Sequence, residues 1–281
     1  MSEPTILLDG LMFPEGPRWH DGRLWFSDMH AREVVAVDES GARETIVEVP
    51  NDPSGLGWLP DGDLLVVSMR DRRLLRFDGT TLQEHADLSP LAPFYCNDMV
   101  VDERGRAYVG NFGFDLHAGE TLASTNLILV EPDGRAREVA DDLMFPNGAV
   151  ITPDAQTLIV AESGAQRLTA FAIGADGSLS DRRIWAELGT VPDGISLDAE
   201  GSIWVAVPTT PGAFVHVAEG GEVKQRIELE EHGGFACMLG GDDGRTLFLL
   251  EARTSNPAEI EGPGNGRIRT VPVDVPRAGW P

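Results

Sequence analysis

The chain has 281 residues, 42% of them hydrophobic, so it can build a sizeable core and is not globally disordered. Its 46 acidic and 22 basic residues give a net charge of −24, which repels phosphate backbones and excludes nucleic acid as a partner. The two cysteines, Cys96 and Cys237, are too few and too widely spaced for a disulfide framework.

The N-terminal stretch is acidic and contains proline, whereas a signal peptide has a basic region and an apolar core. Within it, Thr5–Leu8 is apolar enough to form a strand. The longest apolar runs, such as Leu64–Val67, are far too short to span a bilayer. We therefore expect a soluble, cytoplasmic protein without membrane contact, present as a monomer or a small homo-oligomer.

From residue 16 onward one pattern recurs: an apolar strand, a tight turn, a second apolar strand, a polar break and a third strand. The copies start 39, 43, 50, 46 and 43 residues apart, at Gly16, Gly55, Asp98, Gly148, Gly194 and Cys237. Four-stranded propeller blades repeat at about this spacing, whereas a β-helix needs shorter repeats and a pair of β-sandwiches gives no reason for six similar copies. Long stretches with a helical period are absent from the sequence. The pattern predicts an all-β, six-bladed β-propeller.

A propeller must close its ring, and the N-terminal stretch Thr5–Leu8 has no blade of its own. The last blade is expected to end in a strand at Arg267–Val273. Pairing of these two strands would close the ring and cover an edge that otherwise invites aggregation. Six blades leave no internal boundary, so residues 1–281 are expected to form a single β-propeller domain.

Oxygen-donor side chains recur just before the innermost strands, which line the channel of a propeller. These positions hold Glu15, Ser54, Asn97, Asn147 and Asp193, with Phe235–Ala236 in the sixth copy. Three of them share the frame apolar-Pro-X-Gly, with Glu, Asn and Asp at X. Asn and Asp also occur in turns for local reasons, but turn geometry alone requires neither a carboxylate nor an amide. Such oxygens suit a hard cation, so the pattern favours a metal site.

The chain resembles the family of gluconolactonase, senescence marker protein and luciferin-regenerating enzyme over nearly its whole length. The motifs that carry the resemblance are L-M-F-P-E-G-P-R-W, C-N-D-M-V-V-D-E-R-G-R-A-Y-V-G, F-P-N-G-A-V-I-T-P-D, V-P-D-G-I-S-L-D-A-E-G-S-I-W-V-A and C-M-L-G-G-D-D-G-R-T-L-F-L. The resemblance implies one catalytic divalent metal in the funnel, with Glu15, Asn147 and Asp193 as its ligands. Asn97 matches an asparagine that binds substrate or, in some relatives, the metal. Ca²⁺ is the first choice for the cation, with Mg²⁺, Mn²⁺, Zn²⁺ and Fe²⁺ as alternatives.

Just upstream of Asn97 the sequence departs from sugar lactonases, which commonly carry an arginine there. This chain has Tyr95 in that segment, which offers one hydroxyl and an apolar ring. We expect Tyr95, Asn97, Asn111 and Asp115 to bind substrate. An apolar lining would favour a substrate less polar than gluconolactone, and its candidates are Phe94, Phe112, Phe114 and Phe235.

The predicted activity is metal-dependent hydrolysis of a small lactone or ester, in which the cation polarises the ester carbonyl and Asp193 is the general base. A serine hydrolase is disfavoured because the sequence has no G-x-S-x-G elbow. Two alternatives stay open: hydrolysis of organophosphates or aryl esters at the same metal, and a metal-stabilised propeller that only binds. His117 and His232 are candidates for the funnel. Cys96 and Cys237 fall in opposite blades and are expected to be buried, unpaired thiols.

Overall fold

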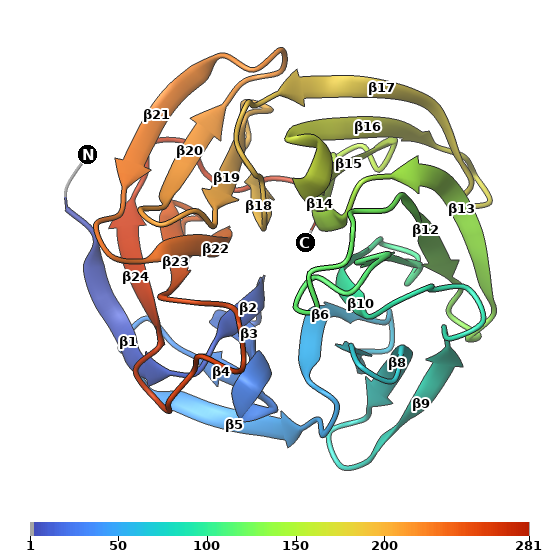
Figure 1. The fold of residues 1–281 in the computed structure, drawn as a ribbon, viewed down its shortest axis with the longest axis horizontal. Helices are drawn as coiled ribbons and strands as arrows, with labels where there is room; N and C mark the ends of the chain where they lie inside the picture. The colour runs from blue at the N-terminus through green and yellow to red at the C-terminus, as the bar shows by residue number, and fades with distance from the viewer. Residues whose placement is uncertain (1–2, 281) are drawn as a thin grey trace.

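The computed structural model describes residues 3–280, which form six four-stranded antiparallel sheets around a central channel (Figure 1). The four blades that follow the N-terminal strand are β2 (Pro14–His20), β3 (Arg23–Asp28), β4 (Glu33–Val37) and β5 (Arg43–Glu48); β6 (Pro53–Trp58), β7 (Leu64–Ser68), β8 (Arg73–Phe77) and β9 (Leu82–Asp87); β10 (Cys96–Val101), β11 (Ala107–Asn111), β12 (Thr125–Val130) and β13 (Ala136–Leu143); and β14 (Pro146–Ile151), β15 (Thr157–Glu162), β16 (Arg167–Ile173) and β17 (Leu179–Glu187). The fifth blade is β18 (Ile195–Leu197), β19 (Ile203–Val207), β20 (Ala213–Val217) and β21 (Val223–Glu228), and the sixth is β22 (Gly233–Gly240), β23 (Thr246–Ala252), β24 (Gly266–Pro272) and β1 (Thr5–Leu11). The predicted six-bladed propeller is confirmed.

Ring closure follows the prediction as well. The N-terminal strand β1 is the outermost strand of the sixth blade and pairs antiparallel with β24. The register runs from Thr5 opposite Thr270 to Leu11 opposite Gly266. The first strand of the chain therefore completes the four-stranded sheet made by its last three strands, and this blade closes the ring.

Tight turns between strands follow from local chemistry. In the first blade, Asp21 and Gly22 between β2 and β3 have φ angles of 49° and 71°, the positive values that a two-residue hairpin turn of the Asp-Gly type requires. Helical structure in residues 3–280 is limited to two 3₁₀ turns, Met29–Ala31 and Ser163–Ala165. Neither turn has the length or apolar character needed to cross a membrane.

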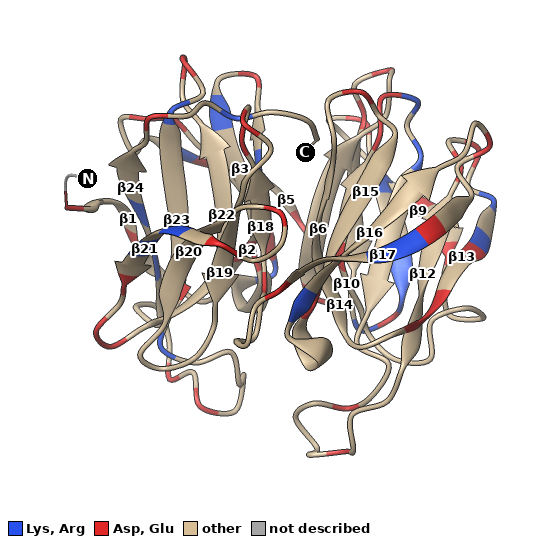
Figure 2. Cartoon of the chain, turned by 90° about the horizontal axis from the view of Figure 1, so that it is seen from above, with Lys and Arg blue, Asp and Glu red and all other residues tan. Residues whose placement is uncertain are grey.

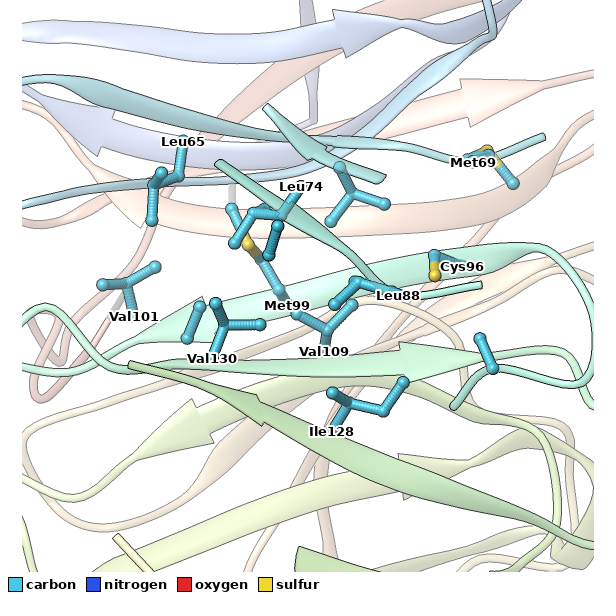
Figure 3. Close-up of a cluster of buried hydrophobic side chains, with 14 of the residues drawn as sticks. Leu65, Met69, Leu74, Leu88, Cys96, Met99, Val101, Val109, Ile128 and Val130 are labelled. Carbon is cyan, nitrogen blue, oxygen red and sulfur yellow. The ribbon is translucent and has the colours of Figure 1, made fainter. Parts of the chain in front are cut away.

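The core lies between neighbouring blades, because each sheet packs both of its faces. Strand β7, for example, is buried at all five positions, which explains its uninterrupted apolar sequence. Figure 3 shows one such layer, in which side chains of the second blade meet those of the third. Leu65 and Leu74 pack there with Met99 and Val109. Charged residues lie mainly outside these layers, and Figure 2 shows acidic residues gathered in the loops at both ends of the strands.

The C-terminal segment crosses one end of the ring, a feature that the sequence pattern did not indicate. Trp280 exchanges backbone hydrogen bonds with Ile151 at 2.8 and 2.9 Å, and Ala278 N–H donates to Leu197 O at 3.0 Å. These partners are the last residues of the inner strands β14 and β18. The segment therefore ties the fourth and fifth blades together at the end of the channel where their inner strands finish, and Figure 1 shows the C-terminus near the centre of the ring.

Candidate functional site

A cavity of about 440 Å³ occupies the end of the channel where the inner strands begin. Four of the positions singled out in the sequence line it together: Glu15 on β2, Asn97 on β10, Asn147 on β14 and Asp193 just before β18. The last three are less than 10% exposed, whereas Glu15 is half-buried. Residues from four blades, separated by up to 178 positions in the chain, thus share one enclosed space.

A backbone irregularity at the start of the inner strands accompanies this convergence. The pairing with the second strand shifts between Glu15 and Arg18, between Cys96 and Met99, and between Pro146 and Ala149. Bulges of this kind re-aim side chains and are frequent beside functional sites. In a regular strand, side chains at these positions would alternate into the packed layers between blades. The bulges explain how Glu15, Asn97 and Asn147 face the cavity instead.

The glycine of the apolar-Pro-X-Gly frame is required by the close packing of neighbouring inner strands. A Cβ atom on Gly148 would lie 2.7 Å from the Cα of Gly194, and one on Gly16 would lie 2.6 Å from the carbonyl oxygen of Ser54. Neighbouring inner strands therefore approach too closely around the channel for any side chain at this position. The frame combines two demands: glycine permits the close approach of the blades, and the residue before it faces the cavity.

The two carboxylates of the cavity carry unusual electrostatics. Burial raises the pKa of Glu15 to about 8, an effect that its hydrogen bond with Gly16 N–H opposes and Asp98 reinforces. Burial, with Glu15 and Asp98 nearby, also raises the pKa of Asp193 well above its ordinary value, although a hydrogen bond from Asn147 favours its ionised form. The floor of the cavity is thus a cluster of carboxyl groups that repel one another.

The floor is closed by a buried ion pair that the sequence analysis missed. Arg18 Nη2 lies 2.7 Å from Asp98 Oδ1, and the guanidinium also donates to Leu56 O at 3.0 Å, to Pro17 O at 2.7 Å and to Met99 O. Arg18 lines a second cavity, of about 290 Å³, at the opposite end of the channel. One signal for Asp98 was present: it stands where four of the other repeat copies have glycine.

The donor set fits a hard divalent cation. Glu15, Asn147 and Asp193 offer two carboxylates and an amide, and burial, which raises the pKa of both carboxyls, disfavours their charged forms unless a cation is shared between them. In the described part of the chain, no group of three or more His, Cys, Asp or Glu side chains is arranged to hold a metal. The predicted ligand set falls outside that definition, because it consists of two carboxylates, Glu15 and Asp193, and the amide of Asn147.

The other predicted substrate-binding residues divide. Tyr95 lines the cavity, but Asn111 and Asp115 do not. Asn111 is fully buried, and its side chain is hydrogen-bonded to Thr125 and, at 2.9 Å, to Asn126 Oδ1. The carboxylate of Asp115 accepts hydrogen bonds from the backbone N–H groups of His117, at 3.1 Å, and Ala118, at 2.9 Å, and so caps a turn. The geometry gives neither residue access to a ligand in the cavity.

The aromatic wall is close to what the sequence indicated. Of the four predicted phenylalanines, three line the cavity, and Phe94 instead stacks on Tyr95 with ring centroids 4.2 Å apart. Phe13 and Phe145 complete the wall. His117 also lines the cavity, whereas His232 does not.

One lining residue, an arginine, was not singled out in the sequence. Arg70, in the turn after β7, reaches the cavity from the second blade, and its guanidinium carbon lies 5.9 Å from the centroid of the Tyr95 ring. Sequence reasoning looked for an arginine beside Asn97 on the third blade. A charged residue in a turn is normally predicted to be solvent-exposed, so the local sequence gave no indication that Arg70 lines the cavity.

Both cysteines are free and buried, as expected. Cys96 begins the inner strand of the third blade and packs in the layer shown in Figure 3. Cys237 lies in the sixth blade, on the other side of the ring. Burial raises the pKa of the Cys96 thiol to about 12 and that of Cys237 further, so neither offers a thiolate at neutral pH.

Comparison with known proteins confirms the resemblance drawn from the motifs. Residues 13–253 match the family model described as the SMP-30/gluconolactonase/LRE-like region. The chain is 25% identical over 279 residues to a 6-deoxy-6-sulfogluconolactonase of Pseudomonas putida, covering 95% of this chain and 93% of the relative. It is 27% identical over 245 residues to a pentonolactonase of Haloferax volcanii, covering 85% and 81%. A calcium-binding protein, regucalcin, of Agrobacterium tumefaciens shares the fold, with a TM-score of 0.82, 22% identity and coverage of 99% and 96%.

Proposed function

Because the chain belongs to the SMP-30/gluconolactonase/LRE-like family, we propose that it hydrolyses a small lactone in the cavity where the inner strands begin. The observation that carries the proposal is the convergence of Glu15, Asn97, Asn147 and Asp193 in one cavity beside an aromatic wall. Two relatives over most of the chain are named as lactonases, which supports the same reaction class.

In this proposal Glu15, Asn147 and Asp193 hold a divalent cation, for which Ca²⁺ is the first choice. When bound, the cation polarises the ester carbonyl and stabilises negative charge on its oxygen. The raised pKa values of Glu15 and Asp193 support this assignment, since buried carboxyls that repel one another gain most from a shared cation.

Asp193 is the general base of the proposed reaction. Its carboxylate accepts the proton of the attacking water, and the hydrogen bond from Asn147 favours the ionised form that this role needs. Asn147 is itself oriented, because its amide donates to Ser163 Oγ at 3.2 Å and that hydroxyl donates to Pro192 O at 2.7 Å. The chain Asn147–Ser163–Pro192 thus links the fourth blade to the residue that precedes the base.

The remaining lining residues bind the lactone. Asn97 has an amide and Tyr95 a hydroxyl with which to orient the ring oxygens. Phe112 and Phe235 present apolar surface to the ring carbons and keep bulk water from the ester. A cavity of about 440 Å³ is of the size that takes a small-molecule ligand.

A pH-indicator assay over γ- and δ-lactones, aryl esters and a phosphotriester tests the proposal, with and without a chelator. We expect lactone turnover that is lost with chelator and restored by Ca²⁺ or another divalent ion. Asp193→Asn keeps the shape of the side chain and should lower kcat by at least about 100-fold. Asp243→Asn, on an exposed turn, is the matched control and should leave kcat unchanged.

The alternatives predict different results in the same assay. Turnover of the phosphotriester or aryl ester alone would reassign the site to that chemistry. Metal binding without turnover of any substrate would favour a propeller that only binds. Full lactonase activity in Asp193→Asn would remove Asp193 from the role of base.

A further inference from the structure

The cavity is asymmetric in charge, because its one fixed cation lies on the side of the second blade. Among the described residues that line it, Arg70 is the only arginine or lysine. Of the four carboxylates among these lining residues, Glu15 and Asp193 come from the first and fifth blades, Asp52 is paired with Arg70, and Glu120 lies in the loop between β11 and β12. A substrate whose ester faces Glu15 and Asp193 therefore has a guanidinium available to another part of its structure.

Arg70 is held by contacts that leave part of its guanidinium free. Its Nε donates to Asp52 Oδ2 at 2.6 Å, and Asp52 is 4% exposed. In residues 3–280, neither terminal nitrogen of the guanidinium has a hydrogen-bond partner. The plane lies against Tyr95, at 5.9 Å from the ring centroid. One edge of the guanidinium is thus anchored, while the two outer donors remain for a ligand.

The carboxylate that anchors Arg70 is shared with other basic side chains. Asp52 faces two guanidinium groups, because Arg32 Nε also lies 3.6 Å from its other oxygen. His30, which lines the cavity, has its Nδ1 at 3.9 Å from the same carboxylate, and burial lowers the pKa of this imidazole. Arg70 therefore shares its carboxylate partner with a second arginine, whose side chain is 61% exposed and lies outside the cavity.

The backbone that carries Arg70 is fixed on both sides. Arg70 N–H donates to Asn51 O at 3.1 Å, and Met69 N–H donates to Asp52 O at 3.0 Å. Met69 O in turn accepts from Cys96 N–H at 3.2 Å, and Figure 3 shows Met69 and Cys96 at the same end of the packed layer. The turn therefore joins the second blade to the strand that carries Asn97, so the position of the guanidinium relative to the floor is set by the fold.

We infer that Arg70 determines specificity, and that the substrate is a lactone with an anionic substituent on a ring carbon other than the carbonyl carbon. This inference rests on the proposed lactonase function. The outer donors of an arginine form two parallel hydrogen bonds with a carboxylate or sulfonate, which a neutral group matches poorly. The aromatic wall contacts the ring carbons between the two ends.

Two lactones that differ only in this substituent test the inference: γ-carboxy-γ-butyrolactone and γ-valerolactone. We expect the wild-type protein to prefer the carboxylate by at least about 10-fold in kcat/KM. Arg70→Met should lower kcat/KM for the carboxylate by about 10- to 100-fold, mostly through KM, and change the neutral lactone by less than threefold. Arg70→Lys should restore the preference only in part, since an ammonium lacks the fork.

Arg32→Met is the matched control, because Arg32 shares Asp52 but does not line the cavity. It should leave the preference within threefold of wild type. Equal loss for both lactones in Arg70→Met would mean that Arg70 is only structural, and an equal effect of Arg32→Met would mean that the general field acts instead of direct contact. Either result overturns the inference.

A binding measurement separates this inference from the lactonase proposal. Tetrahydrofuran-2-carboxylate has the ring and the charge but no ester, and calorimetry can follow its binding to the wild type and to Arg70→Met. Binding that weakens at least 10-fold in the variant supports the role of Arg70 even if no lactone is hydrolysed. Absence of binding to the wild type, or equal binding to both, refutes it.

Discussion

The buried Arg18–Asp98 pair gives the sharpest prediction about the channel, because Arg18 joins three blades. Its guanidinium binds Pro17 O in its own strand, Leu56 O in the second blade, and Met99 O with the Asp98 carboxylate in the third. The arginine is 4% exposed and the aspartate side chain 10%. Arg18→Met keeps the unbranched apolar stem of the side chain and removes all of these bonds.

The expected cost follows from the charges left behind. Removal of one partner of a buried ion pair costs about 3–5 kcal/mol, because the other charge stays in a poorly solvated place. Asp98 would keep only the hydrogen bond from Met99 N–H, at 2.8 Å. For a domain of this size the loss corresponds to a fall in Tm of roughly 10 °C. We therefore expect Arg18→Met to fold but to melt well below the wild type.

Differential scanning calorimetry on matched variants measures this effect. Arg135→Met breaks a pair of similar length, 2.8 Å, whose arginine side chain is 81% exposed, and should leave Tm nearly unchanged, because solvent screens an exposed pair. The double variant Arg18→Met/Asp98→Asn should be more stable than the sum of the single changes predicts, because no charge is then left alone. A Tm for Arg18→Met equal to that of Arg135→Met would refute the view that this pair holds the blades together.

Two further predictions concern the floor of the cavity and the C-terminal segment. The pKa of Glu15 rises from its ordinary 4.5 to about 8 on folding. Between these two pH values the native protein binds more protons than the unfolded chain, so the metal-free protein should lose stability as the pH rises from about 5 to 8. Denaturation at several pH values in chelator should show this slope, and Glu15→Gln should reduce it, with the remainder coming from Asp193, whose pKa burial also raises; an unchanged slope in the variant would assign it to other groups. Gly279→Ala should cost more than Gly201→Ala in urea unfolding, since both positions have a left-handed φ, at 68° and 78°, but only a Cβ at 279 meets a backbone atom, Ile151 O at 2.1 Å. Equal costs would show that the segment does not need its contact with β14.

The fold could be predicted from the sequence because the blade is a local unit that is written six times. Asp-Gly turns, apolar strands and regular spacing are each weak signals, but their repetition leaves few architectures open. Closure by β1 followed from a strand without a partner. The C-terminal segment escaped prediction because its contacts are isolated bridges at Ile151 and Asp198, and bridges of one residue leave no periodic pattern.

The candidate site could be predicted most directly where its residues repeat. Glu15, Asn147 and Asp193 share a frame that repeats around the ring, so their convergence followed from the symmetry of the fold. Asn111 was misjudged because a polar residue at the end of a strand can serve its own sheet, as its bonds within the third blade show. Arg70 belongs to no repeated frame. Whether a side chain in a turn reaches the cavity depends on tertiary packing, which cannot be inferred from a single sequence.

The same position in each blade therefore sets the chemistry of the cavity without altering the ring. Four blades place a carboxylate or an amide there, but the sixth has Ala236, preceded by Phe235, which joins the aromatic wall. The pairing shift at the start of the inner strand is nevertheless present in the sixth blade, between Gly234 and Ala236. The shift thus occurs in a blade without an oxygen donor, whereas the fifth blade supplies Asp193 with no shift between β18 and β19, so the bulge and the donor are independent features. Ala236 does not line the cavity but packs with Phe248 and Leu250 in the core, so the sixth blade contributes only the apolar ring of Phe235 to the site.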